Sequence, residues 1–174
     1  FTLPVVLTML LVARHPMGFV GLSCRLRPSL FLCVAVVAFV SIPAMNRLVA
    51  WNDGLHLPAS MAGLEEMLRG SENRARAAVD MLMGGTTVWD LILGVLLMGC
   101  LTGFVEELFF RGALQQLLRH QLGGNPHVAI WATAAIFSAV HLQFFGFFPR
   151  LLMGAFFGYL FYWSGSLRLP IFAH

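Results

Sequence analysis

The chain has 174 residues, of which 59% are hydrophobic and 11% charged, with a formal net charge of +3 and a mean hydropathy of +0.81. A soluble domain of this length has about 25% charged residues, so the composition excludes an ordinary soluble fold and predicts that lipid surrounds much of the surface. All 11 basic residues are Arg and are scattered among apolar runs. They are typical of loop charges and helix-end anchors in a membrane protein, not of a nucleic-acid-binding surface.

The chain begins with two apolar runs. Residues 2–13 would form a helix of only about 18 Å, too short for a hydrocarbon core of about 30 Å. We interpret this run as the end of a membrane span that is truncated at the N-terminus. Residues 29–45 lie between Arg27 and Arg47 and predict a complete second span.

Residues 46–86 differ in character, because they contain most of the acidic residues of the chain. Apolar residues recur there at helical spacing: Met61, Leu64, Leu68, Ala75, Val79 and Leu82. This pattern predicts an insertion of amphipathic helices that lie at the membrane surface. Gly84 and Gly85 end it.

Residues 87–174 form the predicted catalytic core of a single domain, residues 1–174. Further spans are predicted at residues 88–118, 128–141 and 151–163, and a sixth helix begins at Pro170 and is truncated by the C-terminus. The predicted fold is therefore an all-α, polytopic transmembrane helix bundle with an amphipathic surface-helix insertion and with both termini truncated.

Glu106, Glu107 and Arg111 lie inside the third apolar run, where each charge costs at least about 2.5–3.5 kcal/mol on insertion scales. Glu107 and Arg111 are four residues apart, so they share a helix face and are predicted to pair. One arginine does not neutralise two carboxylates. The pattern therefore predicts that one glutamate acts as a proton acceptor near neutral pH, and a purely structural ion pair is the alternative.

His141 ends the fourth run and shares a helix face with Phe137, and His174 begins the last run. Each histidine alone is typical of a structural residue. Together with the two glutamates and the arginine, they predict a bundle-interior site in which Glu and His share a water. The chain contains no HExxH, no GxSxG and no pair of aspartates in facing spans. A Glu with two His is also a legitimate zinc ligand set, so zinc remains an alternative.

Glu106-Glu107-x-x-x-Arg111, Phe137-x-x-x-His141 and the late His174 resemble the ordered motifs of the CPBP family, the CAAX prenyl proteases and bacteriocin-processing or immunity proteins, also called Abi proteins. The resemblance implies that Glu106 activates a water, that His141 assists it, and that Arg111 holds Glu107 and the helix geometry. It implies that His174 is the first residue of an HxxxN motif that stabilises the oxyanion. The Asn of that motif is expected four residues beyond His174. A metal-free glutamate mechanism is implied, with zinc as the alternative.

The expected function is that of an intramembrane endopeptidase that hydrolyses a peptide bond of a membrane-associated peptide or protein. A non-catalytic bacteriocin-immunity or scaffold protein is the main alternative, and a small transporter or proton relay is another. The expected partners are a peptide or protein substrate and the lipid bilayer, with no nucleic acid. The expected location is the bacterial cytoplasmic (inner) membrane.

Overall fold

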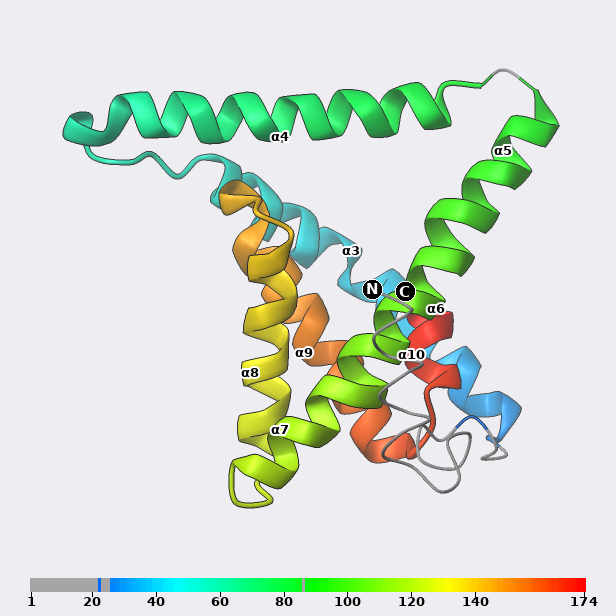
Figure 1. Cartoon of the computed structure of the whole chain (residues 1–174). Helices are drawn as coiled ribbons and strands as arrows, with labels where there is room; N and C mark the ends of the chain where they lie inside the picture. The colour runs from blue at the N-terminus through cyan, green and yellow to red at the C-terminus, as the bar shows by residue number, and fades with distance from the viewer. Residues whose placement is uncertain (1–21, 23–25, 86) are drawn as a thin grey trace.

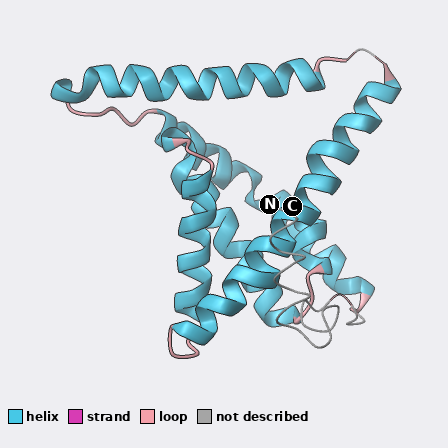
Figure 2. Cartoon of the chain, in the orientation of Figure 1, coloured by secondary structure: helices cyan, strands magenta, loops and turns pink. Residues whose placement is uncertain are grey.

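The computed structural model describes residues 22, 26–85 and 87–174 of the chain. Every regular element in these ranges is a helix, and no strand occurs among them (Figures 1 and 2). The predicted all-α fold is thus confirmed. The predicted first span, residues 2–13, lies outside the described residues.

The described part of the chain forms six helices, one of which changes its winding along its length. They are α3 (Pro28–Asp53), α4 (Ala62–Met83), a continuous helix Val88–Gln121, α8 (Pro126–Val140), α9 (Phe147–Ser164) and α10 (Arg168–Ala173). Within the continuous helix, α5 (Val88–Gly94), α6 (Thr102–Glu107) and α7 (Gln115–Gln121) alternate with π-helical segments Val95–Leu101 and Leu108–Leu114.

Three helices are long and apolar enough, by length and composition, to cross a membrane. They are Pro28–Asp53, Val88–Gln121 and Phe144–Ser164, and the apolar helix α8 is shorter. Large apolar side chains on the outer surfaces of α3 and α5 are exposed, among them Phe39, Val40, Val88 and Trp89. Because such a surface is stable only against hydrocarbon, the chain is an integral membrane protein.

Three predicted boundaries differ from the structure. α3 continues to Asp53, with Gly54 as its C-terminal cap, so the first residues of the predicted 46–86 insertion belong to the second span. The predicted surface helices form one helix, α4, which continues through Gly63 and Gly70. α9 begins at Phe147 and not at residue 151, after a 3₁₀ turn at Phe144–Gly146.

α8 and α9 form a closely packed antiparallel pair. A Cβ at Gly154 would lie 3.2 Å from the Cα of Ala134, and a Cβ at Gly158 would lie 2.9 Å from Ile130 Cγ2. The absence of side chains at these two glycines, spaced four apart, lets the backbones approach, as in small-xxx-small helix contacts in membranes. This contact fixes α9 against the helices that contribute the site.

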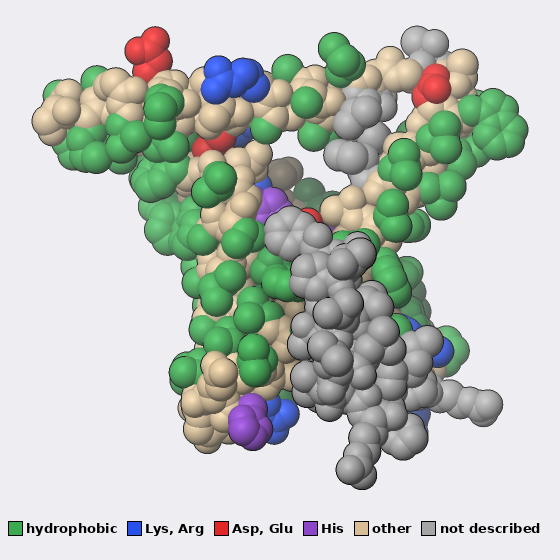
Figure 3. Space-filling model, viewed as in Figure 1, with side chains coloured by type: hydrophobic (Ala, Val, Ile, Leu, Met, Phe, Trp, Pro, Cys, Tyr) green, Lys and Arg blue, Asp and Glu red, His purple; other side chains and the backbone are tan. Residues whose placement is uncertain are grey.

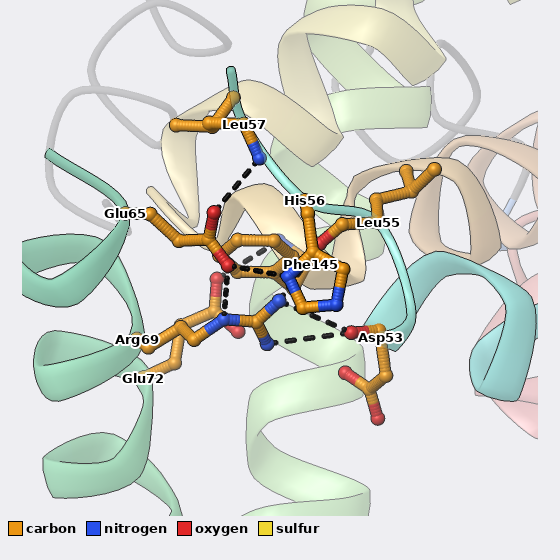
Figure 4. A network of polar contacts seen from close by, with 8 residues as sticks. All are labelled: Asp53, Leu55, His56, Leu57, Glu65, Arg69, Glu72 and Phe145. Atoms are coloured by element: carbon orange, nitrogen blue, oxygen red, sulfur yellow. Dashed lines mark hydrogen bonds and ion pairs between the residues drawn. The ribbon is translucent and has the colours of Figure 1, made fainter. Parts of the chain in front are cut away.

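α4 lies across one end of the bundle and connects the ends of α3 and α5 (Figure 1). Figure 4 shows how its first half is anchored: Arg69 donates to Glu65 at 2.9 Å and to the backbone oxygens of Asp53 and Leu55, and stacks over the ring of Phe145 at 3.8 Å. The hydrogen bond from Arg69, with others from Leu57 and His56, lowers the pKa of Glu65 from 4.5 to about 2.

Two further side chains of this region satisfy backbone donors at the start of the next span. Glu72 of α4 accepts from the backbone N–H of Phe145 at 2.9 Å, and buried Asn52 of α3 accepts from the N–H of Phe148 at 3.3 Å. The first N–H groups of a helix have no partner within the helix. These contacts therefore fix α4 and α3 to the beginning of α9.

Candidate active site

Three predicted catalytic residues from three helices meet at one point. His141 Nε2 lies 3.6 Å from Glu106 Oε1, and His174 Nε2 lies 3.7 Å from Glu106 Oε2. Glu106 belongs to α6, His141 follows α8, and His174 follows α10. Their side chains are 22%, 29% and 17% exposed, so the group is accessible from a cavity but largely shielded.

Both imidazoles are held by their other nitrogen. His141 Nδ1 lies 2.7 Å from the backbone oxygen of Phe137, one helical turn earlier, and His174 Nδ1 lies 3.1 Å from Glu107 Oε1. A backbone carbonyl oxygen can only accept a hydrogen bond, and so can the oxygen of an ionised Glu107. The Nδ1 nitrogen of each histidine is therefore assigned as the donor. In the neutral imidazoles, both Nε2 lone pairs are therefore directed at the Glu106 carboxylate.

Glu107 and Arg111 form the predicted ion pair, and it is fully buried. Arg111 NH1 donates to Glu107 Oε1 at 2.7 Å, and both side chains are 0% exposed. Arg111 NH2 also donates to the backbone oxygen of Gly154 at 2.9 Å, which connects the motif helix to α9. The same Glu107 Oε1 also lies 3.1 Å from His174 Nδ1, so the ion pair contacts the third helix of the site.

Aromatic rings surround this pair and the two histidines. The guanidinium carbon of Arg111 lies 4.8 Å from the ring centroid of Phe137 and 5.3 Å from that of Phe157. Phe137 is 4% exposed and contacts the ring of His141 edge-on at 4.9 Å, while Phe157 stacks on His174 at 5.3 Å. The rings thus exclude water from the ion pair and restrict both imidazoles.

Gly103 is a site residue that the sequence analysis did not identify. A Cβ at this position would lie 3.0 Å from Cδ2 and 3.1 Å from Cγ of His174. The glycine, one turn before Glu107, therefore leaves the space in which the imidazole lies. The signal was its spacing of three and four residues from the two glutamates, but glycine is common in membrane helices and this spacing alone is not specific.

The site opens into a cavity of about 480 Å³. Its lining includes the Glu106, His141 and His174 side chains from the bundle and the Glu72 and Arg76 side chains from α4. Figure 3 shows histidine and acidic side chains in the hollow under α4. The cavity is therefore large enough for a short extended stretch of peptide beside Glu106, and α4 forms one of its walls.

Comparison with known proteins identifies the second half of the chain. Residues 88–174 match the family model for the type II CAAX prenyl endopeptidase Rce1-like proteins. The chain belongs to this family. The matched region contains the Glu106, His141 and His174 cluster described above, and the family is one of peptidases.

A curated relative in the family region has no assigned activity. The chain is 27% identical over 84 residues to the uncharacterized protein YpbD of Bacillus subtilis (strain 168). That alignment covers 46% of this chain and 39% of YpbD, so the chain spans well under half of the relative that it matches. No solved structure matches the chain.

Proposed function

We propose that this protein is an intramembrane endopeptidase that hydrolyses a peptide bond of a membrane-associated peptide or protein with a water activated by Glu106. The observation that supports the proposal is the convergence of two imidazole Nε2 atoms on one carboxylate, at 3.6 and 3.7 Å. These distances are too long for direct hydrogen bonds and suit a bridging water. Membership of an endopeptidase family agrees with this chemistry.

In the proposed reaction, Glu106 accepts a proton from the water while the water oxygen attacks the carbonyl carbon of the peptide bond. The new C–O bond converts the carbonyl oxygen to an oxyanion. The C–N bond then breaks, and the proton held by Glu106 passes to the leaving amine nitrogen. A general base of this kind contributes about 10²- to 10⁴-fold to the rate.

The two histidines have different proposed roles because their second contacts differ. His141 is fixed by a backbone carbonyl and orients the water beside Glu106. His174 is held through Nδ1 by the Glu107 carboxylate, and its Nε2 donates to the oxyanion when that nitrogen carries a proton. One well-placed oxyanion donor is worth about 3–4 kcal/mol. The Arg111 charge offsets that of Glu107 and leaves Glu106 as the less compensated carboxylate.

The proposal is tested with the full-length protein in liposomes and a library of membrane-associated peptides. Glu106→Gln is expected to abolish cleavage and leave folding intact, whereas Glu66→Gln, at an exposed position of α4, is expected to cleave normally. Cleavage that Glu106→Gln retains would refute the proposal. No cleavage by the folded protein would favour the non-catalytic immunity or scaffold function.

The same cleavage assay tests whether the activity depends on zinc. Among the described residues, no group of three His, Cys, Asp or Glu side chains is arranged to hold a metal ion. Glu106 and the two neutral imidazoles are nevertheless the residue types that zinc binds. Cleavage indifferent to chelator is expected; cleavage abolished by chelator and restored by zinc would indicate a metalloprotease. We propose the bacterial cytoplasmic membrane as the location, to be tested by fractionation.

A further inference from the structure

Arg150 is a cation of the active-site cavity that the proposed mechanism does not use. It lies in the first turn of α9 and lines the same cavity as Glu106, His141 and His174. Its side chain is partly buried, with the NH1 nitrogen enclosed and without a hydrogen-bond partner. A charge in an apolar helix is expensive, and the Glu72 and Glu106 carboxylates offset it from beyond ion-pair distance.

The partners of Arg150 do not satisfy its donors. Its NH2 group hydrogen-bonds to Gln143 Oε1, and no carboxylate of the described residues lies within ion-pair distance of it. The nearby Glu72 accepts a backbone N–H instead, and Arg76, the other arginine of the cavity, pairs with Asp53 at 3.0 Å. An unsatisfied guanidinium N–H is costly, and because Arg150 lines the cavity, an acceptor bound there could satisfy its donors.

The backbone also leaves space at this guanidinium. A Cβ at Gly146 would lie 3.3 Å from Arg150 NH2 and 3.4 Å from NH1. Gly146 belongs to the 3₁₀ turn that leads into α9 and lines the cavity as well. The edge of the guanidinium that carries NH1 and NH2 therefore packs against the bare backbone at Gly146, which restricts its orientation.

We propose that Arg150 binds a carboxylate of the substrate beside the scissile bond, so that it determines specificity without touching the reacting atoms. The five N–H donors of a guanidinium match the two oxygens of a carboxylate. The carboxylate is either the free C-terminus of a substrate cleaved near its end or an acidic side chain within it. This inference rests on the proposed function, because it assumes that the bound peptide is a substrate. Binding of the carboxylate can nevertheless be tested without cleavage.

The experiment measures binding to full-length protein bearing Glu106→Gln, which removes turnover. Three fluorescent peptides of one sequence are compared: a free C-terminal acid, the C-terminal amide, and the amide with one internal Glu. A second protein combines Glu106→Gln with Arg150→Gln. A charge-matched control adds Arg74→Gln, at an exposed position of α4 that does not line the cavity.

The expected result is that one carboxylate-bearing peptide binds about 10- to 100-fold more tightly than the plain amide, as a charge-assisted hydrogen-bond pair implies. Arg150→Gln reduces this ratio to about one without weakening the plain amide, and Arg74→Gln keeps it. Which peptide gains, the free acid or the internal Glu, identifies the source of the carboxylate.

Two results would overturn the inference: equal binding of all three peptides in the Glu106→Gln parent, or a ratio that persists in Arg150→Gln. Should Arg150→Gln not fold, Arg150→Lys replaces it, and the ratio is then expected to fall but not to vanish because the charge remains. Cleavage by wild-type protein is measured alongside. A carboxylate preference without cleavage would refute the proposed function and leave the binding site standing.

Discussion

The buried pair of Glu107 and Arg111 gives the sharpest test of how the site is held. Both side chains are 0% exposed, and Arg111 NH1 lies 2.7 Å from Glu107 Oε1. Arginine side chains stay protonated in proteins. Glu107→Gln would leave a buried guanidinium without its main counter-charge. Removing one member of such a pair costs about 3–5 kcal/mol in the free energy of unfolding.

A double-mutant cycle separates this pairing from the other contacts of Arg111. The full-length protein is unfolded by SDS titration as wild type, Glu107→Gln, Arg111→Met and the double variant. The double variant is expected to be less destabilised than the sum of the two single variants by at least about 1 kcal/mol, because it contains no uncompensated buried charge. Glu66→Gln, on the exposed surface of α4, is expected to change stability by less than about 0.5 kcal/mol.

The reasoning fails if Glu107→Gln costs less than about 1 kcal/mol, or if the effects of Glu107→Gln and Arg111→Met simply add. Either result would mean that the carboxylate and the guanidinium do not depend on each other for their burial. The packing of Arg111 against Phe137 and Phe157 and its bond to the Gly154 oxygen would then account for its place in the bundle.

Three other predictions follow from the geometry. Gly103→Ala pushes a Cβ into the imidazole of His174 and is expected to lower kcat/KM by about tenfold or more. Gly99→Ala, with nothing within 4 Å of its Cβ, is the matched control. The pKa of Glu65 is about 2 in the folded chain against an ordinary 4.5, so its stabilisation of the α4 anchor is complete above about pH 4.5 and is lost as the pH falls towards 2. Protection of residues 54–61 from hydrogen exchange, taken relative to the intrinsic rate at each pH, should therefore fall with acid, and constant protection over this window would contradict that. Phe137→Ala is expected to cost about 3–5 kcal/mol of unfolding free energy by SDS titration, whereas Ile136→Ala, at an exposed position, should cost clearly less.

The cluster of Glu106, His141 and His174 was predictable because charged and imidazole groups are rare in apolar runs and tend to meet in a bundle interior. The pairing of Glu107 with Arg111 followed from their spacing on one helix face, and the structure has it as predicted. Their chemical roles remain predictions, since proximity alone demonstrates no reaction.

Other features depend on tertiary contacts that a sequence pattern does not contain. Arg150 was not identified from the sequence, because the fifth span was expected to begin at residue 151, whereas α9 begins at Phe147 and includes it. α3 extends to Asp53, past the predicted end of the span, and its polar Asn52 is buried and accepts from the N–H of Phe148. Gly154 matters only because α8 and Arg111 both meet it.

The two π-helical segments, Val95–Leu101 and Leu108–Leu114, lie on either side of the Glu106–Glu107 pair. Their hydrogen bonds skip one residue more than those of an α-helix, so each segment shifts the angular phase of everything that follows it. A cysteine-accessibility scan along Val88–Gln121 would therefore not keep one helical period: labelling maxima would slip at each segment. A helical wheel drawn through the whole span assigns residues after the first shift to the wrong face, and mutagenesis of this span has to be designed segment by segment.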